Sequence, residues 1–250
     1  SQDGSYFYHW NTNGLKPAND YVVSAALTDA AGQSDTNSSL MVALFLENPA
    51  RYAESLEIDF SIPARGLPIK FQRYYLNDMK HSTPLGYNWT HNYYMRITEL
   101  EDGSVELWDE KDVWNFFTKN LDGTYNGPPG KHYALIKNAD NSFTFKRPDN
   151  ITYNFSIYHI MLPDRVTTSS YRLAFIEDLN GNRISLTYDN STSFLPNLLY
   201  ITDASGRQVL TFDYYPYGPI KSITDFDGRI FNYEYDSYGN LTKVTDPAGE

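Results

Sequence analysis

Hydrophobic and polar residues alternate with a period of two along most of the chain. Ile58, Phe60 and Ile62 alternate with their neighbours, and so do Leu67, Ile69 and Phe71. The same alternation follows turn residues downstream, at Val105 and Leu107, Phe143 and Phe145, and Tyr153, Phe155 and Ile157. Successive side chains of a strand point to opposite faces, so this pattern predicts strands with one buried face. Because turn residues recur about every eight to twelve positions, we expect an all-β array of hairpins.

The first 46 residues have a pattern of their own. Apolar and small residues alternate over Tyr21–Leu27, which predicts a strand, although Ala and Leu also permit a helix over Val22–Ala31. The apolar run Leu40–Leu46 has the length of a buried strand. Residues 1–60 hold eight of the chain's 31 acidic residues and only two of its 20 basic ones. We therefore expect a separate N-terminal domain.

The last third of the chain contains a repeat. An Asp-x-x-Gly turn recurs four times, and its successive copies start 25, 22 and 21 residues apart. Asp at the first position of a β-turn binds nearby backbone N–H groups, and Gly supplies a positive φ, so the pattern predicts structural turns. The four turns are Asp178–Gly181, Asp203–Gly206, Asp225–Gly228 and Asp246–Gly249.

Each turn leads into a strand rich in aromatic residues. An Arg follows the glycine directly at Arg207 and Arg229, and one position later at Arg183. A period of about 20 to 25 residues is typical of stacked units that bury an apolar face only together, which favours a scaffold over an active site. The strands are expected to end on an aromatic residue followed by Asp, at Tyr188–Asp189, Phe212–Asp213 and Tyr235–Asp236.

The segment Ile223–Gly249 resembles the YD repeat of the Rhs (rearrangement hotspot) family. The motifs D-x-x-G-R, Y-x-Y-D, G-N-L-T and D-P-x-G occur there in the order typical of that family. Upstream, Phe60–Pro68 and Pro84–Tyr93 resemble the segment that precedes the repeats in Rhs proteins. The resemblance covers roughly residues 45 to 250 and implies a β-hairpin sheet that spirals into a hollow shell. In bacterial relatives such a shell often encloses a C-terminal toxin, and in animal teneurins it forms part of an adhesion ectodomain.

A second resemblance concerns the N-terminal segment. Trp10, the run Tyr21–Ala25 and the stretch Thr28–Gly32 resemble the last strands of a bacterial Ig-like domain. We therefore expect three parts, namely Ig-like strands over residues 1–46, the pre-repeat hairpins over 47–165 and the YD repeats over 166–250. The predicted fold is all-β, with a YD-repeat sheet that forms a partial spiral shell and the remnant of an Ig-like β-sandwich.

Composition limits the chemistry that this chain can perform. It contains no Cys, which excludes disulfides, cysteine zinc sites and thiol catalysis, and which favours a bacterial protein. The net charge of −11 argues against nucleic-acid binding, because phosphate recognition needs a basic face. No apolar run approaches the length of a membrane span, so we expect no membrane insertion.

No catalytic, cofactor or metal site is predicted. The five His residues are scattered, and no metalloprotease, nucleophile-elbow or phosphate-loop motif is present. Calcium is the alternative interpretation of the repeat turns, because Asp178-x-Asn180 and Asp225-x-Asp227 carry several oxygens, but both lack the distal Glu of an EF-hand loop. Asp246-Pro247-Ala248-Gly249 is also similar to the autocleavage site of Rhs shells, although the same residues form an ordinary repeat turn.

The leading hypothesis is a non-enzymatic structural segment of a secreted or cell-surface bacterial protein, either a shell or a toxin-delivery scaffold. The alternatives are an adhesion module whose Tyr and Trp rings bind glycan or a receptor, and a subunit of an extracellular filament built by strand addition. The expected partners are the rest of a parent chain or a second copy. A shell around a folded toxin of about 100 residues needs on the order of 35 strands, and we expect this chain to supply about half of them.

Overall fold

The computed structural model describes residues 18–28, 34–44, 54–158, 169–189 and 196–250. These residues form strands and turns and contain no helix, so none of them forms a helical membrane span. The all-β prediction is confirmed. The chain consists of two compact units, Ser1–Arg51 and Tyr52–Glu250. The boundaries of the three expected parts, after residues 46 and 165, stay predictions.

The N-terminal unit contains an antiparallel hairpin. Strand β1 (Ala18–Thr28) pairs with β2 (Ser34–Leu44), with Val22 opposite Met41. The strand expected over Tyr21–Leu27 is therefore present, and the helical alternative is wrong. The strand expected over Leu40–Leu46 lies within β2 as far as Leu44. The Ig-like resemblance stays a prediction, and Trp10 lies outside the described residues.

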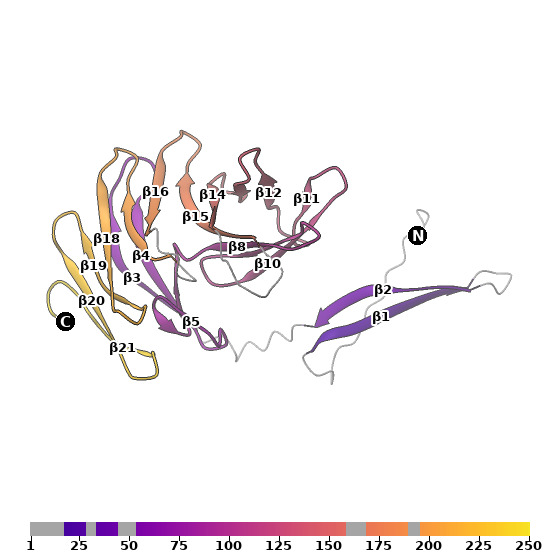
Figure 1. The fold of residues 1–250 in the computed structure, drawn as a ribbon, viewed down its shortest axis with the longest axis horizontal. Helices are drawn as coiled ribbons and strands as arrows, with labels where there is room; N and C mark the ends of the chain where they lie inside the picture. Colours follow the sequence, from indigo (N-terminus) through magenta and orange to yellow (C-terminus); the bar gives the residue numbers. More distant parts are fainter. Residues whose placement is uncertain (1–17, 29–33, 45–53, 159–168, 190–195) are drawn as a thin grey trace. The chain divides into compact units, whose positions relative to one another are not determined.

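The second unit is built on a sheet of 14 strands, most of which follow one another as an antiparallel meander (Figure 1). Its hydrogen-bonded path runs β11-β10-β9-β8-β15-β16-β17-β18-β19-β20-β21, and β12, β13 and β14 join the sheet at β15. The strands are β8 (Arg96–Glu99), β9 (Val105–Trp108), β10 (Trp114–Lys119), β11 (Tyr125–Asn126), β12 (Ala134–Lys137), β13 (Phe143–Lys146), β14 (Thr152–Tyr158), β15 (Ser169–Glu177), β16 (Arg183–Tyr188), β17 (Leu198–Thr202), β18 (Gln208–Tyr214), β19 (Ile220–Asp225), β20 (Ile230–Tyr235) and β21 (Leu241–Thr245).

Strand β15 joins the two halves of this sheet. One of its edges pairs with β14 from Ser170 to Glu177. Its other edge pairs first with β8, over Ser169–Arg172, and then with β16, over Phe175–Glu177. The early hairpins and the later repeats are therefore continuous through the hydrogen bonds of a single strand.

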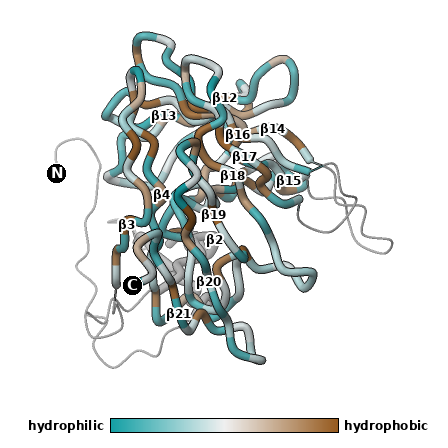
Figure 2. Tube along the Cα trace, turned by 90° about the vertical axis from the view of Figure 1, so that its left-hand side faces the viewer, coloured by the Kyte–Doolittle hydropathy of each residue, from teal (hydrophilic) through white to brown (hydrophobic). Residues whose placement is uncertain are grey.

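A three-stranded sheet packs on one face of the repeats. This small sheet consists of β3 (Glu54–Ile62), β4 (Ile69–Leu76) and β7 (Trp89–His91), and the two-residue strands β5 (Ser82–Thr83) and β6 (Gly86–Tyr87) lie in the loop between β4 and β7. Phe60 packs against Phe231 with ring centroids 4.7 Å apart, and Phe71 packs against Phe212 at 5.7 Å. The buried hydrophobic residues form one core, to which the small sheet, the early hairpins and the repeats all contribute. Figure 2 shows hydrophobic residues in brown along the strands.

One kind of turn connects most of the strands. The N–H of its fourth residue donates to the C=O of its first, the first residue's N–H donates to the C=O of the residue after the turn, and the fourth residue has a positive φ. This is the type I turn with a left-handed residue that is common in three-residue hairpins. In the described residues it starts at Leu100, Asp109, Asn120, Asn138, Arg147, Asp178, Asp203, Tyr215, Asp225, Asp236 and Asp246. The turn therefore connects β15 to β16 and each successive pair of strands from β17 to β21, and it begins well before residue 166.

A β-bulge changes the faces predicted from alternation in β3. A register shift between Ile58 and Phe60 leaves Phe60 buried and Ile58 half exposed, so these two residues do not share the buried face. The extra residue, Asp59, rotates the strand at this point. Ile157, near the end of β14, is 37% exposed as well, but the register shift between Asn154 and Phe155 has its extra residue in β15, at Ala174. The expectation of one buried face was therefore wrong at Ile58 and Ile157.

Candidate functional site

The repeat turns are stabilised by their own aspartates. In the turn Asp225–Gly228, Oδ1 of Asp225 accepts bonds from the backbone N–H groups of Asp227 and Arg229, at 3.0 and 2.9 Å. Oδ2 accepts a bond from Nε of Arg229 at 2.7 Å, and the guanidinium forms an ion pair with the same oxygen. Asp203 and Arg207 repeat this arrangement. Each buried carboxylate therefore binds its own turn and the Arg that begins the next strand.

Arg207 also contacts the next turn at the same end of the strands. The guanidinium of Arg207 lies 4.0 Å from the ring centroid of Phe226, the second residue of the turn Asp225–Gly228. The N–H of Phe226 donates to the carbonyl of Val209 at 3.2 Å. In the first copy, Arg183 stacks instead on Phe175, at 3.7 Å. The Asp203–Arg207 pair thus links its turn to the next one.

The predicted turns and the predicted strand ends lie at opposite ends of the strands of the meander. Turns at one end begin at Asp178, Asp203, Asp225 and Asp246. At the other end, Asp189 and Asp236 follow the last residues of β16 and β20. Phe212 and Asp213 lie inside β18, which continues to Tyr214, so the strand end predicted there is wrong. The turn at this place is Tyr215–Gly218, in which Pro and Gly supply the conformation without Asp. The four glycines expected in the Asp turns have positive φ, and no described atom lies within 4 Å of a Cβ added to them.

The aromatic strand ends have a common hydrogen bond. The hydroxyls of Tyr188, Tyr214 and Tyr235 each donate to a backbone carbonyl in an earlier strand, on Leu173, Leu198 and Ile220, at 2.9, 3.0 and 2.9 Å. Burial raises the pKa of all three tyrosines, which keeps the hydroxyls protonated as donors.

A buried ion pair within the small sheet is hydrogen-bonded to the repeats. Nε and Nη2 of Arg73 donate to the two carboxylate oxygens of Asp59, at 2.7 and 2.9 Å, and the hydroxyl of Tyr233 donates to Oδ2 of Asp59 at 2.6 Å. The side chains of Arg73 and Asp59 are 9% and 3% exposed. Burial and the neighbouring Asp59 carboxylate raise the pKa of Tyr233 well above its ordinary value, so this tyrosine stays neutral.

Sequence reasoning missed this network. Asp59 lies between apolar residues of an alternating strand, and simple alternation places it on the solvent face. The bulge at Ile58–Phe60 turns Asp59 toward Arg73 and Tyr233 instead. Its partner Tyr233 is 174 residues away in the chain, and no local signal in the sequence connects the two.

The loop that contains β5 and β6 makes further contacts with the repeats. The N–H of Ile220 donates to the carbonyl of Pro84 at 2.7 Å, and the N–H of Tyr87 donates to the carbonyl of Gly239 at 3.1 Å. A Cβ added to Gly86 would lie 2.5 Å from that same carbonyl oxygen. Residue 86 therefore has to be glycine for this approach to occur.

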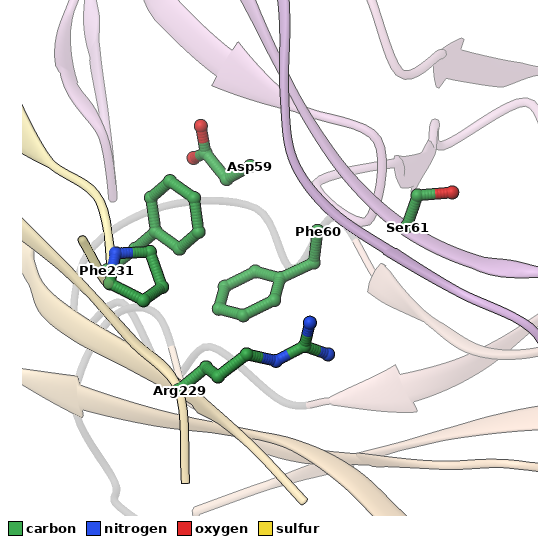
Figure 3. Close-up of a pocket in the computed structure, with 6 residues that line it drawn as sticks. Asp59, Phe60, Ser61, Arg229 and Phe231 are labelled. Atoms are coloured by element: carbon green, nitrogen blue, oxygen red, sulfur yellow. The ribbon is translucent and has the colours of Figure 1, made fainter. Parts of the chain in front are cut away.

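A buried histidine and a cavity are further features of the described residues. Among them, no group of three or more His, Asp or Glu side chains is placed to hold a metal ion. Burial lowers the pKa of His91 to about 3, which leaves a neutral ring packed between Phe71 and Tyr94. A cavity of about 230 Å³ lies between β3 and the repeats (Figure 3). It is lined by Asp59, Phe60, Ser61, Arg229, Phe231 and Pro247.

Two family profiles match parts of this chain. Residues 52–113 match a domain of unknown function, DUF6531, and residues 197–250 match the RHS repeat. Similar curated proteins include the tRNA nuclease WapA of Bacillus subtilis strain 168, 29% identical, and the tRNA3(Ser)-specific nuclease WapA of Bacillus spizizenii, 32% identical, each over 203 residues. These alignments cover 75% of this chain but only 8% of each relative.

Two solved structures have a similar fold. The crystal structure of TcdB2-TccC3 matches with a TM-score of 0.50 and 12% identity, over 96% of this chain and 17% of that one. The Tc holotoxin pore of Photorhabdus luminescens matches with a TM-score of 0.50 and 13% identity, over 98% of this chain and 16% of that one. At these identities the likeness concerns the fold alone.

Proposed function

Because the chain is an Rhs-repeat protein, as its motifs predicted, we propose that it forms a non-enzymatic stretch of shell wall in a longer bacterial protein. That protein is secreted or displayed at the cell surface, and the wall serves as a scaffold for toxin storage or delivery. The observation that carries this proposal is the continuous meander, to which the small sheet is joined by the hydrogen bond from Tyr233 to the buried carboxylate of Asp59.

The dimensions of the sheet favour a wall segment over a closed container. Its longest hydrogen-bonded path has 11 strands, from β11 to β21. At about 4.8 Å per strand, this path spans roughly 50 Å of wall. A shell around a folded domain of about 100 residues needs on the order of 35 strands per turn, so further wall has to come from elsewhere in the parent protein.

The nuclease activity named for the WapA relatives is proposed to belong to other parts of those proteins. This chain spans only 8% of their length. Its net charge of −11 disfavours tRNA binding, and Arg73, Arg207 and Arg229 are already paired with carboxylates.

Two measurements test this proposal. Labelled tRNA incubated with the 250-residue chain and divalent cations should remain intact on a denaturing gel, and cleavage that copurifies with the chain would contradict the non-enzymatic role. A single wall unit should also unfold in one cooperative transition. In a variant in which Trp10, Trp108 and Trp114 are replaced by Phe, tryptophan fluorescence reports on the small sheet through Trp89. Far-UV circular dichroism reports on all strands. Separate melting transitions by these two probes would contradict a wall in which the small sheet and the repeats act together.

A glycan-binding role is a second candidate, favoured by tyrosines on one edge of the meander. Tyr217 and Tyr238 are 66% and 87% exposed, and each is the third residue of its turn. The ring of Tyr217 stacks on Tyr215 at 5.1 Å, which holds it in place. Exposed, fixed aromatic rings suit stacking on sugars. A glycan array should then show binding that the double variant Tyr217→Ala/Tyr238→Ala loses, and an array without binding would dismiss this role.

A further inference from the structure

Two successive repeats differ at one equivalent position. Phe226 is the second residue of the turn Asp225–Gly228, and its ring lies 4.0 Å from the guanidinium of Arg207. Pro247 is the second residue of the next turn, Asp246–Gly249, and Arg229 takes the place of Arg207. Both arginines are held by the aspartate of their own turn in the same way. In the described part of the chain, no aromatic ring of a turn stacks on Arg229 as Phe226 stacks on Arg207.

The change from Phe to Pro explains why a cavity opens here. The turn that contains Phe226 is drawn against β18 by the hydrogen bond from its N–H to the carbonyl of Val209. Pro has no N–H, so Pro247 cannot make the corresponding bond to Phe231. The Pro ring is also smaller than the Phe ring. The second turn therefore lacks both the bond and the ring that close the first one.

The resulting cavity has the properties of an aromatic-ring site. Its volume is about 230 Å³, and it is lined by the apolar side chains of Phe60, Phe231 and Pro247 and by the polar side chains of Asp59, Ser61 and Arg229. Figure 3 shows the labelled side chains around it. The guanidinium of Arg229 is fixed by Asp225, whose carboxylate is buried. A cavity of about 150 Å³ lined by apolar side chains is large enough for benzene, so this one has room for a single substituted ring.

We propose that the cavity between β3 and the turn Asp246–Gly249 binds one monocyclic aromatic ring, in the place that Phe226 occupies one repeat earlier. The guest ring packs against Phe60 and Phe231, and the guanidinium of Arg229 faces it as that of Arg207 faces Phe226. The ring is supplied either by a Tyr or Phe side chain of a peptide or by a free phenolic compound, since both present the same chemistry. This binding site is separate from the proposed role as shell wall.

The test uses the 250-residue chain and two aromatic probes. p-Cresol represents the free phenol and N-acetyl-tyrosinamide the peptide side chain, and cyclohexanol and N-acetyl-leucinamide are the non-aromatic controls. Saturation-transfer NMR should show the aromatic probes binding with a dissociation constant on the order of 1 mM, as expected for a fragment of this size. The backbone amide signals of residues 59–61 and 229–231 should shift with the same constant. Binding of p-cresol alone would identify a free phenolic compound as the source of the ring, and binding of N-acetyl-tyrosinamide alone would identify a peptide side chain. Binding of both probes would show that the cavity recognises the ring itself.

Two variants locate the binding. Pro247→Phe restores the ring of the preceding repeat, fills the cavity from within and should weaken binding of the aromatic probes at least fivefold. Ala248→Phe adds the same ring at the neighbouring exposed position and should leave binding unchanged. The proposal is overturned if the wild-type chain binds the aromatic probes no better than the controls, or if Pro247→Phe, folded by circular dichroism, binds them as well as wild type does.

Discussion

The later repeats and the small sheet are both β structure, but different interactions determine them. In β16–β21 the key side-chain bonds are local, because each turn aspartate reaches residues two and four positions away, and the tyrosine hydroxyls reach carbonyls 15 or 16 positions away. In the small sheet, Asp59 depends on Tyr233, 174 residues away. Local bonds thus define each hairpin of the repeats, whereas long-range bonds determine where the small sheet packs.

Arg73→Met should have the largest effect, because it removes the ion-pair partner of Asp59, the residue that connects the small sheet to Tyr233. It leaves the Asp59 carboxylate buried with Tyr233 as its remaining partner, and losing one member of a buried pair costs roughly 3–5 kcal/mol of unfolding free energy. For a chain of this size, that corresponds to a fall in Tm of roughly 10 °C, which scanning calorimetry measures. The matched control is Lys221→Met, since Lys221 and Asp213 form an exposed pair worth at most about 1 kcal/mol. Equal effects of the two variants would contradict the role assigned to Asp59 and Arg73.

The same division decides what could be read from the sequence. The turns at Asp203 and Asp225 were predictable, because Asp and Gly form them through bonds within five residues. The turns that begin at Leu100 and Arg147 were predicted as turns from Asp102–Gly103 and Asp149–Asn150, but not as copies of the repeat turn, because they share its backbone conformation without the Asp-x-x-Gly letters. The turn that begins at Asn120 was not predicted. The end of β18 was likewise predicted at Phe212, whereas the strand continues to Tyr214, because the turn that follows has no Asp at its first position.

The buried network could not be predicted from alternation. Nothing in residues 54–62 announces the bulge that turns Asp59 inward and Ile58 outward. Whether a strand takes an extra residue depends on the surface that it packs against, which here comes from β20. The cavity beside Pro247 cannot be predicted from the sequence either, because it is lined both by β3 and by residues 229–247, which are far from β3 in the chain.

Two glycine variants separate local strain from long-range packing. Gly228 and Gly86 have positive φ values of 82° and 91°, so Ala at either position costs roughly 1–2 kcal/mol of unfolding free energy. The added Cβ meets open space at Gly228 but lies 2.5 Å from the Gly239 carbonyl oxygen at Gly86. Gly86→Ala should therefore be more destabilising than Gly228→Ala by at least about 1 kcal/mol. Chemical denaturation measures both, and equal losses would mean that the contact between the loop and the repeats contributes little.

His81 should make the position of the same loop sensitive to pH. Its Nδ1 lies 2.8 Å from the carbonyl oxygen of Met79, and its Nε2 lies 3.1 Å from Oδ2 of Asp112, which also binds Arg96. Both neighbours are acceptors, so only the doubly protonated ring suits both. The nearby Asp112 carboxylate, opposed by partial burial and by Arg96, raises the pKa of His81 above its ordinary value.

A raised pKa means that the stabilisation by His81 is complete at low pH and is lost as pH rises through the folded-state pKa. The Tm difference between wild type and His81→Gln should therefore be larger at pH 6 than at pH 8.5. The ring of His91 stays neutral in the folded chain over this pH range, because burial lowers its pKa to about 3. It therefore serves as an uncharged reference for the protonation of His81. A Tm difference that does not change with pH would show that folding does not raise the pKa of His81.

The smallest expected effect is that of calcium on the repeat turns. Ca²⁺ takes six to eight oxygen ligands, but both carboxylate oxygens of Asp225 already accept bonds from its own turn and from the cationic Arg229. Asp178 is the stricter test, because no Arg pairs with it. Its oxygens accept bonds from the N–H groups of Asn180 and Asn182 and from the Asn182 amide.

The melting temperature with and without calcium tests this expectation. A calcium site that is half-filled at about 20 μM would add about 2.7 kcal/mol to the unfolding free energy at a hundredfold higher calcium concentration, which raises Tm by several degrees. We therefore expect the same Tm in about 2 mM calcium and in excess chelator. A calcium-dependent rise of several degrees that Asp178→Asn abolishes would show instead that the turn aspartates are ligands, and that the regularity of the repeats depends on an ion as well as on local hydrogen bonds.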